Sequence, residues 1–226
     1  MKRKSIISAM YITIITATII LLATLAGPAI YWKVSPVTPL KVWVVDKTVP
    51  KPDYREHKGL MWVLNYLKFS EEDKTQFSYD KDFYGFYPTG SGSYSTREMP
   101  DNKENPDLIY VTDTYGVYTD DLKYETVNGN ASELVYGGLE NKEVESLKLN
   151  LNSGNTLIGE FNISSAPTNL ENRTELGKIF GVHWKGWKGR YFKSLNKSGE
   201  VNDWIIKNYE EEYREMWNFT GGGFVL

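Results

Sequence analysis

The feature that most constrains this chain is an uncharged, apolar stretch close to its N-terminus. Basic residues Lys2 to Lys4 precede it, and the stretch from Ser5 to Trp32 contains no acidic or basic side chain. A membrane-spanning helix needs about 20 largely apolar residues, and Ile6 to Leu25 alone reaches that length. A cleaved signal has a shorter core of about 7 to 15 residues, and Thr24-Leu25-Ala26 is a weak cleavage site. We therefore expect an uncleaved anchor rather than a removed signal or a buried core helix.

The charges beside this stretch predict its orientation. Positive side chains keep a short N-terminal tail in the cytoplasm, so residues 1–33 should form a cytoplasmic tip and a single transmembrane helix. Tyr31 and Trp32 suit the outer interface of the bilayer. Residues 34–39 contain prolines and form a short, stiff spacer. Residues 40–226 should then form one domain outside the cell membrane, and the membrane is the partner that the sequence predicts.

The composition of the chain excludes several classes of function. With 226 residues and 41% hydrophobic content, the chain can bury one sizeable core. Its formal net charge of -3 comes from mixed acidic and basic residues, which argues against a nucleic-acid partner. It has no cysteine, so disulfides, thiolate metal sites and a cysteine nucleophile are ruled out. Its two histidines lack a His-Glu-x-x-His spacing, and we expect no metal and no cofactor.

Hydrophobic periodicity after the spacer predicts alternating strands and helices. Short apolar runs that fit buried parallel strands occur at residues 40–45, 107–112 and 156–161. Amphipathic stretches that fit helices occur at residues 60–67, 141–152, 169–180 and 200–217. Residues 76–79 form a weaker strand candidate, and the aromatic run 83–87 is interpreted as a loop over the sheet edge or as a ligand-stacking platform. This alternation predicts an α/β fold, a three-layer sandwich with a mainly parallel sheet.

Polar side chains lie at or just after the carboxyl end of each of the three predicted strands. They are Asp46, Lys47, Asp113, Thr114, Tyr115, Glu160 and Asn162. Because the carboxyl ends of parallel strands meet at one edge, we expect these side chains to line one crevice. Its carboxylates could act as general acid and base, since like charges raise one pKa, or hold a hard cation. They could equally pair with nearby cations and tie loops together.

The first histidine lies at the start of a predicted helix. The helix dipole disfavours the charged form of His57 there, so His57 could be a neutral acceptor or simply a surface cap. Its neighbour Glu56 is a further candidate ligand-binding residue. With Asp113 and Glu160, His57 completes the set of catalytic candidates.

The second histidine opens a segment rich in tryptophan and basic residues. His183, Trp184, Trp187 and Arg190 are its candidate ligand-binding residues. Aromatic faces beside cations suit a sugar or an anionic ligand, through stacking and charge-assisted hydrogen bonds. The same pattern fits a lid packed on the domain, and we keep both interpretations.

Several motifs together resemble a known group of proteins. They are Asp46-Lys47-Thr48, residues 54–59, residues 113–116, Glu160-Phe161-Asn162 and residues 181–184. They resemble a family of membrane-anchored bacterial proteins whose outer domain is similar to the glutamine amidotransferase-like superfamily. The resemblance covers residues 40–226 and implies a flavodoxin-like fold but no particular activity. Glutaminase members carry a cysteine on the turn that residues 159–162 occupy here, so thiolate-dependent glutamine hydrolysis is excluded.

These observations lead to three hypotheses about function. The first is an extracytoplasmic binding or sensing module for a small polar or glycan ligand, with aromatic walls and paired carboxylates. The second is a hydrolase of an envelope glycan or small polar substrate that uses Asp113 and Glu160, which requires two carboxyls facing an open cavity in different environments. The third is a structural subunit of a membrane complex with an unidentified protein partner, which requires an exposed apolar patch.

Overall fold

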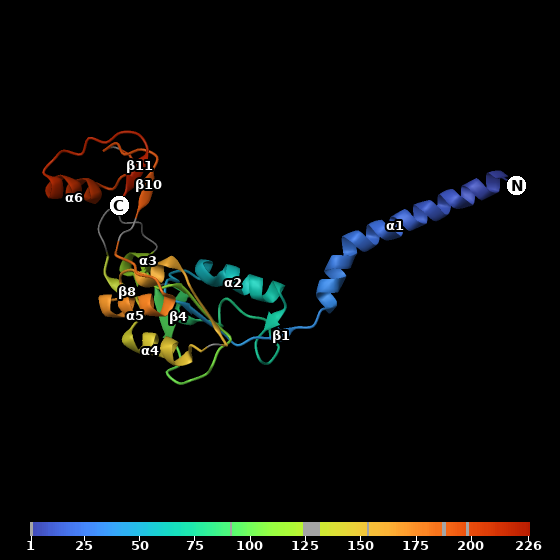
Figure 1. Cartoon of the computed structure of the whole chain (residues 1–226), viewed down its shortest axis with the longest axis horizontal. Coiled ribbons are helices and arrows are strands. Elements are labelled where there is room, and N and C mark those ends of the chain that lie inside the picture. The colour runs from blue at the N-terminus through green and yellow to red at the C-terminus, as the bar shows by residue number, and fades with distance from the viewer. Residues whose placement is uncertain (1, 91, 124–131, 153, 187–188, 198) are drawn as a thin grey trace.

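The chain forms an α/β domain with a mixed, mainly parallel central sheet, preceded by one long apolar helix (Figure 1). The computed structural model describes residues 2–90, 92–123, 132–152, 154–186, 189–197 and 199–226.

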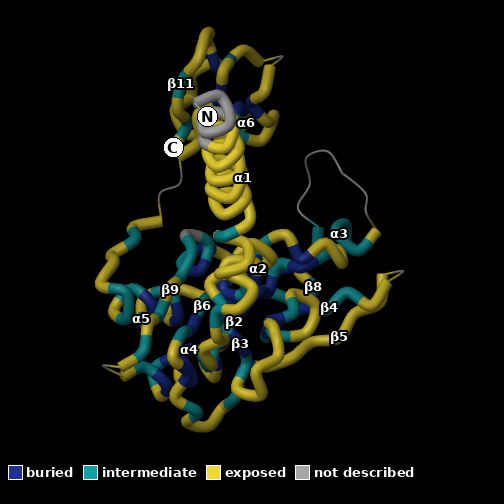
Figure 2. Tube along the Cα trace, turned by 90° about the vertical axis from the view of Figure 1, so that its right-hand side faces the viewer, coloured by how far each residue is buried: buried dark blue, intermediate teal, exposed yellow. Residues whose placement is uncertain are grey.

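The N-terminal helix α1 spans Lys2–Val34, and its portion Met10–Val34 is long and apolar enough to cross a membrane. Its apolar side chains are exposed along the helix, and Figure 2 colours nearly all of its described residues as exposed. Pro28 lies inside α1, where it removes a backbone hydrogen bond and favours a kink, and the helix bends before its C-terminal end (Figure 1). An apolar helix of spanning length is therefore confirmed, while its orientation stays a prediction.

The central sheet has the strand order β5-β4-β2-β6-β9. Its strands are β2 (Val42–Asp46), β4 (Tyr84–Gly90), β5 (Ser93–Arg97), β6 (Leu108–Asp113) and β9 (Thr156–Gly159). All neighbouring pairs are parallel except β4 and β5, which form an antiparallel hairpin. The chain places β4 on one side of β2 and β6 on the other, so the direction of sheet growth reverses between β2 and β6. A crevice at such a reversal is the usual ligand site of open α/β sheets.

Three of the strands lie where periodicity predicts them, and one does not. The runs at residues 40–45, 107–112 and 156–161 correspond to β2, β6 and β9, each with small shifts at its ends. The strand expected at residues 76–79 was wrong, because this segment is irregular and contributes only the buried Phe77 to the core. The aromatic run 83–87, interpreted as a loop, instead enters β4, where aromatic side chains fill the buried faces of a strand.

One face of the sheet is covered by helix α2, which spans Arg55–Tyr66. Met61 and Leu64 of α2 pack with Val44 of β2 in one hydrophobic cluster. A helix in this position was predicted from its apolar stripe and is confirmed. Within the predicted stretch Leu64 is buried, but Val63 and Leu67 are exposed, so Met61 and Leu64 rather than the full predicted stripe hold α2 on the sheet.

The opposite face is covered by α4 (Asn141–Asn150) and α5 (Leu170–Phe180). Leu147 and Leu176 pack there with Trp43 in a second cluster. Neighbouring residues of β2 thus face different cores, as the alternation of side chains along a strand requires.

Helix α5 has the ends that its sequence predicts. The side chain of Asn169 accepts a hydrogen bond from the backbone N–H of Asn172, and Gly181 ends the helix with a φ of 65°. Both features satisfy backbone groups that a helix end leaves unpaired. They also determine where the segment after Gly181 leaves α5.

The C-terminal residues build a small unit with its own core. Strands β10 (Arg190–Phe192) and β11 (Gly223–Val225) pair antiparallel, and helix α6 (Asp203–Tyr213) packs beside them. Their cluster contains Phe192, Leu195, Val201, Ile206 and Trp217. Figure 1 shows this unit set apart from the central sheet. The helix expected within residues 200–217 is present, but Trp204 and Tyr213 of its predicted core stripe are exposed.

The remaining elements are short. They are β1 (Thr38–Pro39) paired with β3 (Phe69–Ser70), β7 (Val117–Tyr118) paired with β8 (Leu134–Tyr136), α3 (Thr119–Lys123) and the 3-10 turn η1 (Phe161–Ser164).

Candidate functional site

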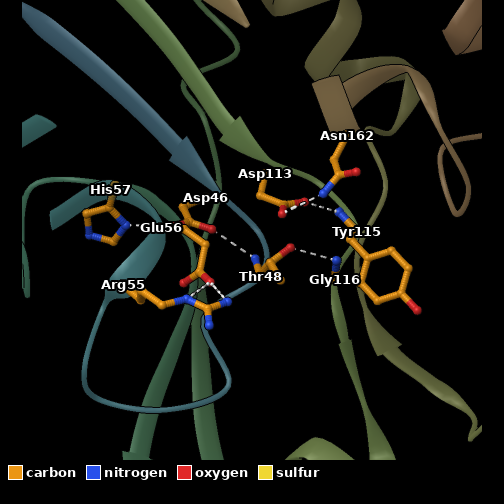
Figure 3. A network of polar contacts seen from close by, with 9 residues as sticks. All are labelled: Asp46, Thr48, Arg55, Glu56, His57, Asp113, Tyr115, Gly116 and Asn162. Atoms are coloured by element: carbon orange, nitrogen blue, oxygen red, sulfur yellow. Dashed lines mark hydrogen bonds and ion pairs between the residues drawn. The ribbon is translucent and has the colours of Figure 1, made fainter. Parts of the chain in front are cut away.

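The first polar pair at the carboxyl edge of the sheet is formed by Asp46 and His57. Asp46 ends β2, and His57 lies in the first turn of α2, which returns over the same edge. The Nδ1 atom of His57 lies 2.6 Å from Oδ2 of Asp46, and both side chains are fully buried (Figure 3). The other Asp46 oxygen accepts the backbone N–H of Thr48 at 3.0 Å. The sequence placed both residues in the site but did not predict that they bond to each other.

The partners of this pair define where its protons lie. Nε2 of His57 is 2.7 Å from the carbonyl oxygen of Tyr79, which can only accept, so Nε2 carries a proton. A second proton lies between Nδ1 and Asp46. Burial raises the pKa of Asp46, while the hydrogen bond with His57 opposes this change. In either proton position the pair has no net charge, which suits a site without solvent.

The second pair joins Lys47 to Glu143. The Nζ atom of Lys47 donates to Oε2 of Glu143 at 2.6 Å and to the carbonyl oxygen of Gly138 at 2.7 Å. It also lies 4.7 Å from the centre of the Tyr136 ring. The same Glu143 oxygen accepts the backbone N–H of Glu140 at 2.8 Å, which caps α4. Lys47 is therefore a buried, fully engaged cation that ties β2 to α4 rather than a free ligand-binding group.

The third cluster surrounds Asp113 at the end of β6. Its Oδ1 accepts the backbone N–H of Tyr115 at 2.7 Å, and its Oδ2 accepts the side-chain amide of Asn162 at 2.9 Å (Figure 3). The adjacent Thr48 hydroxyl accepts the backbone N–H of Gly116 at 2.8 Å. Asp113 and Asn162 are half-buried, and the ring of Tyr115 is exposed. The expectation that the ends of β2, β6 and β9 lie at one edge holds for these residues.

Two further predicted residues are engaged nearby. Oε1 of Glu160 accepts the hydroxyl of Tyr110 at 2.8 Å, and burial together with this bond raises the pKa of Tyr110 to about 12. Glu56 pairs with the exposed Arg55 at 2.7 Å, and this bond raises the pKa of Arg55. Asp113 and Glu160 thus accept hydrogen bonds from different neutral donors, and their role as an acid and base pair stays a hypothesis.

One more predicted residue has a structural role. Thr114 is fully buried, and its hydroxyl is 3.3 Å from the carbonyl oxygen of Asn162. Its own carbonyl oxygen accepts the backbone N–H of Gly138 at 2.8 Å. Thr114 thus supports the loops around the edge rather than facing a ligand.

His183 and Trp184 line a cavity beside α5. The cavity has a volume of about 630 Å³, and its walls are the α5 face Leu170, Arg173, Thr174 and Gly177, with Ser164 and residues 182–186. The guanidinium carbon of Arg173 lies 5.7 Å from the centre of the Trp184 ring. Its Nε atom is buried without a hydrogen-bond partner among the described residues. None of the described lining residues is acidic, so this cavity presents cations to whatever enters it.

Arg190, another predicted binding residue of the tryptophan-rich segment, lies apart from the described lining of this cavity. Arg190 lies in β10 of the C-terminal unit, where its guanidinium carbon is 4.8 Å from the centre of the Phe192 ring. Trp187 lies outside the described residues. Among the described residues, the segment therefore places His183 and Trp184 next to α5 and Arg190 in the C-terminal unit.

Glu143 and Arg173 were not among the site residues predicted from the sequence. Glu143 is the third residue of a predicted helix, and the Glu140-x-x-Glu143 spacing is a capping signal that could have drawn attention to it. Arg173 lies three residues before the inward-facing Leu176, so it borders the buried side of α5, but a charged residue at that border is usually solvated. Neither signal indicates a partner from another element.

No family model, curated protein or solved structure matches this chain. The resemblance to the amidotransferase-like superfamily accordingly stays a prediction.

Proposed function

We propose that the chain is a membrane-anchored binding module for a small, negatively charged polar ligand such as an acidic sugar. The observation that carries this proposal is a cavity of about 630 Å³ in which Arg173 lies beside the Trp184 ring and no described lining residue is acidic. Arginine offers a planar fork to a carboxylate, and a tryptophan face offers stacking to a sugar ring.

The carboxyl edge supports this function as a rigid frame. The 3-10 turn η1 carries Asn162, which bonds Asp113, and Ser164, which lines the cavity two residues later. A preorganised frame reduces the ordering cost of binding. The paired state of Asp46, Asp113 and Glu160 fits a binding module better than a hydrolase, whose general base needs a carboxylate that is free to take a proton.

The fold that we propose for this module is a flavodoxin-like, three-layer sandwich. Two facts support it: α2 covers one face of the sheet while α4 and α5 cover the other, and the parallel strands numbered in chain order run 2-1-3-4. This is the order of the first four strands in flavodoxin-like sheets. With α1 in the cell membrane and its basic end in the cytoplasm, the module faces outward.

A structural role in a membrane complex is the second candidate, because the C-terminal unit exposes a large apolar groove. The groove has a volume of about 860 Å³ and is lined by residues that include Trp204, Tyr209, Tyr213 and Leu226. Exposed apolar patches of this kind commonly mark contacts with other proteins.

Thermal unfolding of the full-length chain in detergent micelles tests the binding proposal. Glucuronate and glucose form a matched pair of probes, since they differ by one carboxylate. We expect glucuronate to raise the unfolding midpoint and glucose to do so less; a ligand at 100 times its dissociation constant adds about 2.7 kcal/mol of stability. Arg173→Gln should abolish the difference between the two probes.

The matched control is Arg190→Gln, which removes an arginine that also lies against an aromatic ring but belongs to the C-terminal unit. It should keep the response to glucuronate. An equal response of wild type and Arg173→Gln would refute the assignment of the cavity. Loss of the response in Asp113→Asn but not in Arg173→Gln would indicate that the ligand binds at the carboxyl edge of the sheet instead.

A further inference from the structure

The outer face of α2 exposes a row of large apolar side chains. Met61 and Leu64 pack in the core, while Trp62 and Tyr66 on the other side of α2 are 64% and 54% exposed. Leu67, the residue that follows the helix, is 56% exposed. A soluble helix normally presents polar groups to water on this face. These exposed side chains therefore mark a candidate contact surface.

This row continues directly into the end of α1. The indole N–H of Trp32 donates to the backbone carbonyl of Tyr66 at 2.6 Å, and the two rings stack with centres 6.4 Å apart. The ring of Tyr66 stacks on Trp62 at 5.1 Å, with only 13° between the planes. Nζ of Lys68 lies 3.8 Å from the centre of the Trp32 ring. Figure 1 shows the corresponding arrangement, with one end of α2 next to the lower end of α1.

These contacts determine the depth at which the aromatic row would lie. An α1 segment of about 20 residues fills the hydrocarbon core of a bilayer, which leaves Trp32 and Lys33 in the headgroup layer. Rings stacked on Trp32 then lie in or next to that layer. Tryptophan and tyrosine favour this layer because their rings are apolar and their N–H and O–H groups remain hydrated, while lysine ammonium groups reach lipid phosphates.

We propose that Trp62, Tyr66, Leu67 and Lys68 form a docking surface for the lipid headgroup layer of the membrane that α1 spans. The domain would thus contact the bilayer through the end of α2 in addition to being attached to it through α1. The occupant is lipid rather than a second protein, because the surface is continuous with the membrane helix and carries the aromatic and cationic side chains of an interfacial belt. This inference rests on the proposed membrane anchoring and is independent of the ligand cavity.

Site-directed spin labelling tests this surface, and the absence of cysteine lets single labels be introduced without removing any residue first. The full-length chain would be labelled at Leu67→Cys, Ile19→Cys or Leu170→Cys and placed in lipid nanodiscs that contain no other protein. Collision with molecular oxygen reports lipid, and collision with a nickel chelate reports water. Ile19 belongs to α1, and Leu170 is an exposed residue of α5.

We expect the label at position 67 to collide with the nickel chelate about fivefold less often than the label at position 170. Substitution of Trp62 and Tyr66 by alanine should bring position 67 to the level of position 170. Trp204→Ala, which removes an exposed tryptophan of α6, should leave position 67 unchanged. Lipid-type collision at position 19 together with water-type collision at position 67 would overturn the docking surface alone. Water-type collision at position 19 would overturn the membrane anchoring as well.

Discussion

The imidazole of His57 and the carboxyl group of Asp46 share a bond of 2.6 Å in a place that solvent does not reach. The pair joins the end of β2 to the start of α2, and its two outer contacts go to backbone groups of Thr48 and Tyr79. Every polar atom of both side chains thus has a partner, so removing either residue leaves a buried group unpaired.

The chemistry of this pair predicts that Asp46→Ala and Asp46→Asn differ. Alanine leaves Nδ1 of His57 unpaired, and we expect the free energy of unfolding to fall by about 3 kcal/mol. Asparagine can donate its amide N–H to Nδ1 of a neutral His57 and still accept from Thr48, so its cost should be about 1 kcal/mol. Chemical unfolding followed by near-UV circular dichroism measures both. Equal losses for the two variants would contradict the proton arrangement.

The Lys47 and Glu143 pair predicts strong coupling across the sheet. Lys47→Met leaves the Glu143 carboxylate buried, and Glu143→Gln leaves the ammonium of Lys47 buried. A double-mutant cycle should give a coupling free energy of about 2 kcal/mol, because each single variant creates an unpaired charge that the double variant lacks. The exposed pair Lys207 and Glu211 serves as the control and should couple weakly. Similar coupling in both cycles would argue against the role assigned to Lys47.

Glu71 predicts a pH dependence of stability. It lines a cavity of about 150 Å³, and burial, followed by repulsion from Asp82, raises its pKa from 4.5 to about 7. A carboxyl whose pKa is higher in the folded state binds protons more tightly when the chain is folded, so protonation stabilises the fold. This contribution to the free energy of unfolding is complete below pH 4.5 and is lost as the pH rises through about 7. Unfolding free energies of wild type and Glu71→Gln, measured between pH 4 and pH 8, should therefore diverge with pH, wild type losing more. Parallel curves would exclude this assignment.

We expect a glycine-to-alanine substitution to change the stability of the fold in opposite directions at two positions. Gly85 has a φ of 140°, and a Cβ there would lie 1.7 Å from the carbonyl oxygen of Asp46. Gly85→Ala must displace the pairing of β2 with β4, and we expect a loss of about 3 kcal/mol or more. Gly59 lies inside α2 with no atom within 4 Å of a new Cβ, so Gly59→Ala should gain about 0.5–1 kcal/mol. Thermal unfolding compares the two; a stable Gly85→Ala variant would mean that the strand pairing tolerates a shift.

The sequence predicted the parts of the fold that depend on local pattern. The apolar runs predicted the positions of β2, β6 and β9, and the helical spacing of apolar residues predicted α2. Burial was predicted less well, because β9 lies at the edge of the sheet and Val63 and Leu67 are exposed. β4 was not predicted as a strand, because it contains Gly85 and Pro88, and these residue types usually indicate a loop. Gly85 is needed there because the β2 backbone lies against it, and that contact belongs to the assembled sheet rather than to the segment.

The candidate site was predictable in its location and not in its pairing. Asp46, Asp113 and Asn162 follow strands, and parallel topology brings strand ends together. The partner of Lys47 lies 96 positions further along the chain, and no local signal connects the two. Arg173 is a candidate binding residue because it lies against the Trp184 ring. That contact forms because the chain turns back at Gly181, where α5 ends. Contacts of this kind depend on the path of loops, which side-chain pattern alone does not specify.

The contact between Trp32 and Tyr66 also determines how far the polar edge stands from the lipid. β2 begins on the side of the sheet where α1 ends and runs away from it for five residues, a length of about 16 Å. Asp46, Asp113 and Asn162 thus lie on the side of the domain that faces away from the anchor. With α1 in a bilayer, molecules would have to approach this edge from the aqueous compartment, and lipids in the same membrane would be out of its reach.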